Sequence, residues 1–151
     1  MLSIPSRPSV ILVETANGRL PGAAGSTEEG TTMEYVLLIY GAEKAWAAAD
    51  DAVRAEVFAG HAEFARLLGE HGHTIKAGAE LQPTSAARTL RGTPDSVDVT
   101  DGPFAETAEQ LGGFYLVETD DIDHVIKLAG LISYGEPIEV RPTTSGEAEA
   151  S

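Results

Sequence analysis

The chain has no cysteine and no long apolar run. Without cysteine, disulfides, a thiol nucleophile and thiolate metal sites are excluded, so a metal could be held only by His and carboxylates. No apolar run approaches the roughly 20 residues that a membrane helix needs. The run Val-Ile-Leu-Val at 10–13 is too short for a secretory signal. We therefore expect a soluble, cytoplasmic protein with no membrane partner.

Positive charge is also scarce. The 24 acidic residues outnumber the 10 Lys and Arg, which gives a formal net charge of −14. Such a field repels phosphate, and no basic cluster offsets it. Nucleic acid and anionic membrane surfaces are therefore not expected as partners.

The length and composition favour one folded domain. A chain of 151 residues with 42% hydrophobic content can bury a single core. Residues 1–32 are rich in Gly, Ser, Pro and Thr, so we expect a leader or a disordered extension, with Met33 as the natural start. We expect residues 144–151 to be a disordered acidic tail. The folding unit is then residues 33–143.

The first half of this unit contains the clearest patterns. Residues 35–40 (YVLLIY) form a continuous apolar run, as in a central strand covered on both faces. Asp50 is a suitable cap for a helix that ends near Gly72. The apolar stripe of that helix has helical spacing. Its members are Val53, Val57, His61, Phe64 and Leu68.

The second half contains shorter elements. We expect strands at 74–81, 113–118 and 138–141, and a hairpin with arms 87–91 and 96–100. A second helix, capped by Asp120 or Asp121, has an apolar face with helical spacing. That face consists of Ile122, Val125, Ile126, Ala129 and Ile132.

The predicted order of elements is that of an α+β, ferredoxin-like domain. Apart from the inserted β-hairpin, it reads β-α-β-β-α-β, which gives an antiparallel sheet with both helices on one face. The other face would be apolar and bare. Such a face usually finds a partner, so we expect a homodimer through the sheet face.

His61 is the first candidate for chemistry. It lies on the apolar stripe beside Gly60, a residue that weakens a helix and suggests a close approach to the backbone. With a carboxylate partner, a partly buried His can act as a general base near neutral pH. The alternative is a core histidine that is satisfied by a backbone carbonyl.

Asp101 is the candidate partner, at the start of Asp-Gly-Pro-Phe. Its carboxylate could instead cap an Asx-turn, with Gly102 supplying an unusual φ. That structural reading does not explain Phe104 followed by Glu106 and Glu109. These residues could line a pocket and bind substrate.

The other candidates carry weaker signals. Arg141 could hold an anionic substrate group or pair with surface acids. His71 and His73 flank a glycine, a poor metal signal by itself, and His124 is expected to face water. We predict no metal site and no cofactor.

The stretch DGPFAETAEQLGGFYLVE at 101–118 resembles the signature of the DGPF-domain proteins, a branch of the YCII-related family. The resemblance extends from MEYVLLIYG at 33–41 to IEVRP at 138–142. It implies a ferredoxin-like fold assembled as a dimeric α/β barrel. It also places the proposed His–Asp pair of the family on His61 and Asp101.

Relatives in the wider superfamily include small enzymes acting on ring-cleavage products and lactones, and monooxygenases. Members of this branch are often encoded beside extracytoplasmic-function sigma factors. Two departures are visible here: Ala108 stands where the family motif often has Lys, and the segment 133–137 is short.

Three hypotheses follow for the function. In the first, a cofactor-independent enzyme acts on a small organic acid or lactone. His61 is then the base, Asp101 orients it, and Glu106, Glu109 or Arg141 positions the substrate. In the second, a non-catalytic module binds a ligand or a protein, for example in sigma-factor control. In the third, a structural dimer has an unused pocket.

Overall fold

The computed structural model of the chain describes residues 31–144. The leader predicted at 1–32 and the tail predicted at 144–151 lie almost entirely outside the described residues. The described part is α+β, as predicted from the sequence.

The main sheet has four strands, β1 (Met33–Gly41), β2 (Thr74–Glu80), β5 (Gln110–Thr119) and β6 (Ile138–Pro142). Their order is β2-β5-β1-β6, and every neighbouring pair is antiparallel. This arrangement is compatible with the ferredoxin-like plan. The apolar run of β1 lies between two other strands, as its continuous hydrophobicity predicts.

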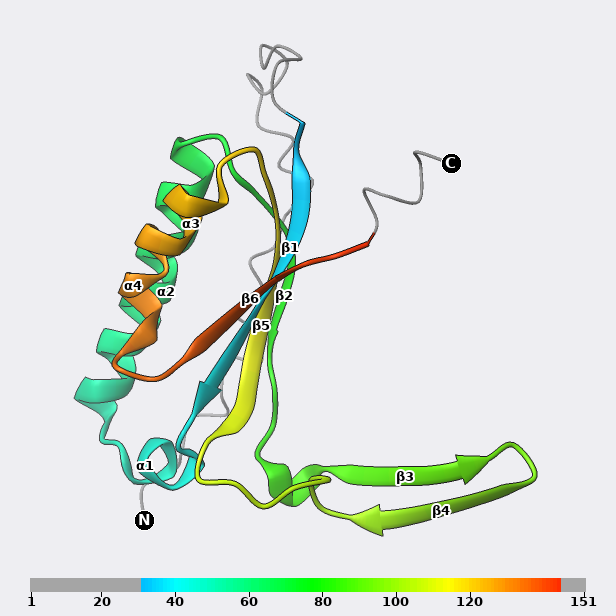
Figure 1. Cartoon of the computed structure of the whole chain (residues 1–151). Coiled ribbons are helices and arrows are strands. Elements are labelled where there is room, and N and C mark those ends of the chain that lie inside the picture. Colours follow the sequence, from blue (N-terminus) through cyan, green and yellow to red (C-terminus); the bar gives the residue numbers. More distant parts are fainter. Residues whose placement is uncertain (1–30, 145–151) are drawn as a thin grey trace.

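Helices cover one face of this sheet (Figure 1). The long helix α2 (Asp51–Glu70) packs there with α3 (Ile122–Leu128) and α4 (Gly130–Ser133), while the short α1 (Glu43–Ala48) lies beyond the end of β1. No helix within residues 31–144 is long and apolar enough to cross a membrane.

The predicted helix caps are present. The Asp50 carboxylate accepts a hydrogen bond of 2.9 Å from the Val53 N–H, and the Asp121 carboxylate accepts one of 3.2 Å from the His124 N–H. Each bond satisfies a backbone donor that has no partner within its helix. The short polar side chains therefore set where α2 and α3 begin.

The core fills the space between the helices and the sheet. On the helix side its members come from the inward stripe of α2 and from the segment of α3 and α4, and on the sheet side from inward-facing residues of β1, β2 and β5. The buried apolar residues are Leu37, Phe64, Leu68, Ile75, Tyr115, Val117, Val125, Ala129 and Ile132.

The second predicted helix differs from the expectation in two respects. It is divided at Ala129 into α3 and α4. Ile126, predicted on the apolar face, is 46% exposed. Val125, Ala129 and Ile132 follow one another at steps of four and three and take up the inward face, so Ile126 is rotated toward solvent.

Strands β3 (Arg88–Thr93) and β4 (Ser96–Asp101) pair with each other in a separate antiparallel sheet. We call these two strands the β3–β4 arm. The arm extends away from the main sheet (Figure 1), and its apolar residues Leu90, Val97 and Val99 are exposed. At its base the Gly102 N–H donates to the Ala87 carbonyl over 2.7 Å.

Candidate functional site

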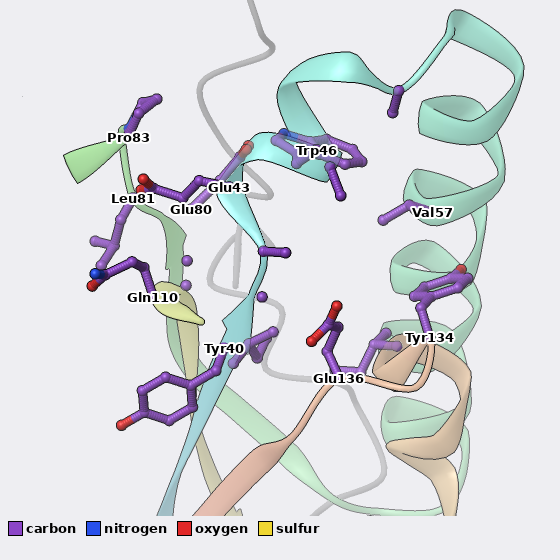
Figure 2. Close-up of a pocket in the computed structure, with 18 of the residues that line it drawn as sticks. Tyr40, Glu43, Trp46, Val57, Glu80, Leu81, Pro83, Gln110, Tyr134 and Glu136 are labelled. Carbon is purple, nitrogen blue, oxygen red and sulfur yellow. The ribbon is translucent and has the colours of Figure 1, made fainter. Parts of the chain in front are cut away.

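A cavity of about 540 Å³ lies between the helices and one end of the main sheet. Its wall comprises α1, the first half of α2, the ends of β1 and β2, the start of β5, and the turn after α4 (Figure 2). Most of the lining is apolar or aromatic. A cavity of this size accommodates a small organic molecule.

His61 lines this cavity and is hydrogen-bonded to a tyrosine of the sheet. Its Nδ1 lies 2.7 Å from the Tyr115 hydroxyl oxygen. His61 is only 7% exposed and Tyr115 only 2%. Among the described residues, Tyr115 is the hydrogen-bond partner of the imidazole, and Nε2 has none.

Periodicity brings the two residues together. His61 lies on the inward stripe of α2 with Phe64 and Leu68. Tyr115 belongs to the inward-facing alternate positions of β5. Beside it on β2 stands Gly78, where a Cβ would lie 2.8 Å from Cδ1 of Tyr115. The missing side chain at position 78 therefore leaves room for the tyrosine ring.

Burial shifts both side chains toward their neutral forms. It lowers the pKa of His61 to about 4 and raises the pKa of the Tyr115 hydroxyl. Ionising either group would place a charge in a poorly hydrated environment, which is unfavourable. At neutral pH the site therefore contains a neutral imidazole and a protonated phenol.

Two proton arrangements fit the bond between His61 and Tyr115. If the phenol donates to Nδ1, Nε2 carries the proton and acts as a donor. If Nδ1–H donates to the phenol oxygen, Nε2 has a free lone pair and acts as an acceptor. The pair can therefore supply or accept a proton at a single atom, Nε2.

The α1 wall of the cavity is held by polar and aromatic contacts. The Glu43 carboxylate accepts hydrogen bonds from the Thr84 N–H and Oγ1, over 2.7 and 2.6 Å. Trp46 meets Phe58 edge to face at 5.9 Å. The Arg54 guanidinium lies 5.2 Å from the Trp46 ring centre and donates to the Trp46 carbonyl over 3.0 Å. These contacts attach a six-residue helix to both neighbouring segments.

The other residues predicted for the site lie elsewhere. Asp101 ends β4 and is exposed, and within the described chain its carboxylate makes no hydrogen bond, either to His61 or to the turn. Gly102 does adopt the unusual φ expected for that turn, +102°. In this chain His61 is hydrogen-bonded to Tyr115 and not to Asp101, and the predicted catalytic role of the His61–Asp101 pair stays a prediction.

The four predicted substrate-binding residues are not among the described residues that line the cavity. Phe104 is 79% exposed, and Glu106 and Glu109 are exposed on the same loop. Arg141 is bound to Glu139 over 3.0 Å on β6. Their roles also stay predictions.

Sequence reasoning predicted a pocket beside His61 but missed Tyr115 and most of the residues that line the cavity. A signal for Tyr115 was present, because the alternation of residues 113–118 places Tyr115 and Val117 on one face of a strand. A tyrosine that faces a core needs a partner for its hydroxyl, and His61 was the polar side chain on the opposing helix stripe. Gln110 was not among the predicted site residues. It lines the cavity, and its Nε2 donates to the Ala105 carbonyl over 3.0 Å, which links that loop to the cavity rim.

A cluster of histidines lies at the far end of α2. The His73 Nε2 and His124 Nδ1 are 2.8 Å apart, and the His73 Nδ1 is 2.7 Å from the Thr119 Oγ1. The sequence predicted that His124 faces water, but in the structure its ring is hydrogen-bonded to His73. Its position in the first turn of α3 brings it against the chain that leaves α2. No group of three or more His, Asp or Glu within residues 31–144 is placed to hold a metal ion.

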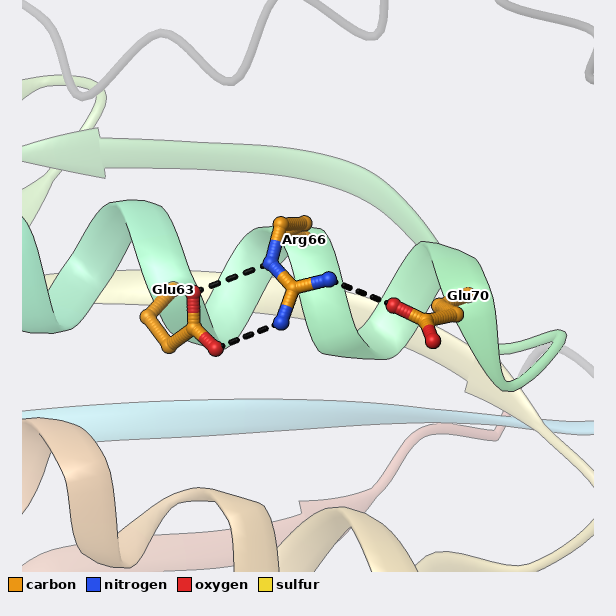
Figure 3. Close-up of polar contacts among 3 residues, drawn as sticks. All are labelled: Glu63, Arg66 and Glu70. Atoms are coloured by element: carbon orange, nitrogen blue, oxygen red, sulfur yellow. Dashed lines mark hydrogen bonds and ion pairs between the residues drawn. The ribbon is translucent and has the colours of Figure 1, made fainter.

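The closest ion pairs of α2 lie on its exposed face. Arg66 bridges Glu63 and Glu70, with N–O distances of 2.6 Å to each (Figure 3). Hydrogen bonding to Glu63 raises the pKa of Arg66, and the same bond lowers the pKa of Glu63. Exposed pairs of this kind contribute little to stability. None of these three residues is among those that line the cavity.

Residues 33–142 match the YCII-related domain family. The chain belongs to this family. An uncharacterized protein of Rhizobium meliloti (strain 1021) is 47% identical over 68 residues. That match covers 42% of this chain and 55% of the relative, so the chain spans about half of the relative's length. The family predicted from the DGPF stretch is confirmed.

Proposed function

We propose that this YCII-related protein binds a small, largely apolar molecule in the cavity and transfers a proton with the His61–Tyr115 pair. The single observation that carries the proposal is the hydrogen bond of 2.7 Å between two buried, ionisable side chains in the cavity wall. Buried titratable groups of this kind are concentrated at functional sites. No cofactor is needed for such a step.

The reaction class is proton abstraction followed by isomerisation, elimination or hydrolysis. In the first step a proton leaves the substrate and binds to the Nε2 lone pair of His61, while Nδ1–H donates to the Tyr115 oxygen. The imidazolium then returns that proton to the product or to the leaving group. A lactone is the simplest neutral substrate for this chemistry.

A non-catalytic ligand-binding role is the second candidate. It is favoured by the pKa of His61, about 4, because a base this weak has little driving force to accept a proton from carbon. The regulatory role that the resemblance to the family leaves open would use the same cavity as a sensor. In that case Nε2 only forms a hydrogen bond with the ligand.

The proposal includes a homodimer through the sheet face. On the face opposite the helices, β1 and β5 pair Val36 with Leu116 and Leu38 with Phe114, which forms an apolar band. Burial of such a band against a second copy is favourable. Asp101 lies on an extended arm, so its predicted role in orienting His61 depends on a second chain.

The dimer is tested by light scattering with size-exclusion chromatography. The wild-type chain should elute as a dimer, and Leu38→Glu should elute as a folded monomer. A monomeric wild type would overturn this part of the proposal. If the wild type is dimeric and the substitution Asp101→Asn leaves the pKa of His61 unchanged, Asp101 does not belong to the site.

Turnover of small lactones and organic acids tests the catalytic role. The wild type should convert at least one compound, and His61→Gln should lose that activity while it remains folded. Tyr115→Phe should reduce the activity less, because the phenol only orients the imidazole. Conversion that survives His61→Gln would overturn the base role. Binding without conversion would favour the sensor.

A further inference from the structure

The charged side chains that line the cavity are mainly acidic. Glu43, Glu80 and Glu136 contribute carboxylates, whereas Lys44 is the one basic residue among the described lining residues. The whole chain also carries a formal net charge of −14. A negatively charged ligand would therefore meet repulsion both from the wall and from the overall field.

Of these acids, Glu136 is the best placed to meet a ligand. Both carboxylate oxygens of Glu43 are already bonded to Thr84. Glu136 forms its hydrogen bonds to Ser133 through its backbone N–H and carbonyl, each over 2.8 Å. The residue is partly buried, and within residues 31–144 its carboxylate has no hydrogen-bond partner. Figure 2 shows the Glu136 side chain rising from the turn before β6 into the cavity.

The rest of the wall suits an apolar body and tolerates a positive charge. Trp46, Val57, Phe58 and Tyr134 are among the lining residues. Aromatic faces attract cations, and the Arg54 guanidinium over Trp46 is an example in this chain. An amine would therefore meet a carboxylate and aromatic rings, one of which, Trp46, already holds the Arg54 guanidinium.

We propose that the ligand of this cavity is an apolar molecule with a protonated amine, and that the ammonium pairs with Glu136. This inference rests on the proposed function in one respect, that the cavity is the ligand site. It replaces the organic acid expected from the sequence with a ligand of the opposite charge. His61 then faces the body of the ligand rather than its charged head.

Three probes of one shape test the charge preference. Cyclohexylmethylamine, cyclohexylmethanol and cyclohexanecarboxylate share a ring and differ in the head group. Isothermal titration calorimetry at pH 7 and low salt gives the affinity of each probe. The amine should bind about tenfold more tightly than the carboxylate, with the alcohol in between, and added salt should reduce the difference.

Two glutamate variants complete the test. Glu136→Gln should reduce amine affinity to that of the alcohol and leave alcohol binding unchanged. Glu63→Gln removes the same charge from the exposed face of α2 (Figure 3) and should leave all three affinities unchanged. Thermal unfolding verifies that both variants are folded.

The outcomes separate this inference from the proposed function. Equal affinity for the amine and the carboxylate, or an amine preference that survives Glu136→Gln, would overturn the amine assignment. Alcohol binding in either case would leave the cavity as a ligand site. If the folded wild type bound none of the three probes, both the inference and the proposed function would fail.

Discussion

His73 and His124 share one hydrogen bond, with the His73 Nε2 2.8 Å from the His124 Nδ1. The Thr119 Oγ1 accepts the Asp121 N–H over 2.8 Å and lies 2.7 Å from the His73 Nδ1. In one arrangement of the hydrogens, the Thr119 O–H donates to the His73 Nδ1, and the His73 Nε2–H donates to His124. This chain of bonds joins the end of α2 to the start of α3.

We predict that Thr119→Val destabilises the protein by about 1–3 kcal/mol, because it leaves a partly buried backbone N–H and the buried His73 Nδ1 without partners. The two side chains are nearly equal in volume, so packing changes little. Urea unfolding followed by circular dichroism measures the effect. Thr100→Val on the exposed β4 is the control and should change stability by less than about 0.5 kcal/mol. Equal effects would contradict the prediction.

The titration of the histidines is a second prediction. Burial lowers the pKa of His61 to about 4, and burial together with His124 and His71 lowers the pKa of His73, opposed by Asp120 and Asp121. Imidazole resonances in NMR spectra should therefore show His61 neutral down to about pH 5. A midpoint for His61 near 6.5 would contradict the burial that the structure shows.

The same shift links folding to pH. Below about pH 6.5 the unfolded chain binds a proton at His61 before the folded chain does. The contribution of His61 to the free energy of unfolding is therefore complete above about pH 6.5. It is lost as the pH falls toward 4, and the loss amounts to about 3 kcal/mol in all. His61→Gln should remove this part of the pH dependence in urea unfolding. His73 accounts for a further part that the variant retains.

Tyr115→Phe tests the importance of the hydroxyl to the fold. The substitution leaves the buried Nδ1 of His61 without its partner, which should cost about 1–2 kcal/mol of unfolding free energy. Tyr35→Phe is the matched control, since the Tyr35 hydroxyl makes only a 3.8 Å contact with the Met33 sulfur. Its effect should be smaller. If the two substitutions cost the same, the His61–Tyr115 bond contributes nothing to stability.

Gly60→Ala should destabilise the protein, although alanine is the better helix former by about 1 kcal/mol. A Cβ at position 60 would overlap the Tyr134 hydroxyl and lie 2.7 Å from the Leu131 carbonyl oxygen. Overpacking of this kind costs about 1–3 kcal/mol. Gly130→Ala, where a Cβ has open space, should be neutral or stabilising in the same thermal unfolding experiment. A stabilising Gly60→Ala would contradict the close packing of α2 on α4.

Local patterns predicted the elements because their causes are local. Asp50 and Asp121 cap helices through bonds that reach only three residues along the chain. The stripe of α2 and the alternation of β5 fix which side chains face the core. The mid-helix Gly60 indicated a close approach, and the structure identifies the approaching group as Tyr134.

The contacts between distant segments could not be predicted in this way. Tyr115 meets His61 because of how α2 crosses the sheet, which no spacing records. His124 meets His73 across 51 positions in sequence. The pairing of Asp101 with His61 was predicted from residue type and from the resemblance to the family, and neither of these fixes a distance. The β3–β4 arm extends away from the main sheet (Figure 1), and Asp101 is not among the described residues that line the cavity of its own chain.

Trp46 is the single tryptophan of the chain, and it lies on α1 between Phe58 and Arg54. Tryptophan fluorescence from this protein therefore reports on one location, and it follows the docking of a six-residue helix. Circular dichroism reports the sheet and the longer helices. If α1 detaches before the rest unfolds, the two melting curves will not coincide, and a two-state fit to the emission alone will underestimate the stability of the domain.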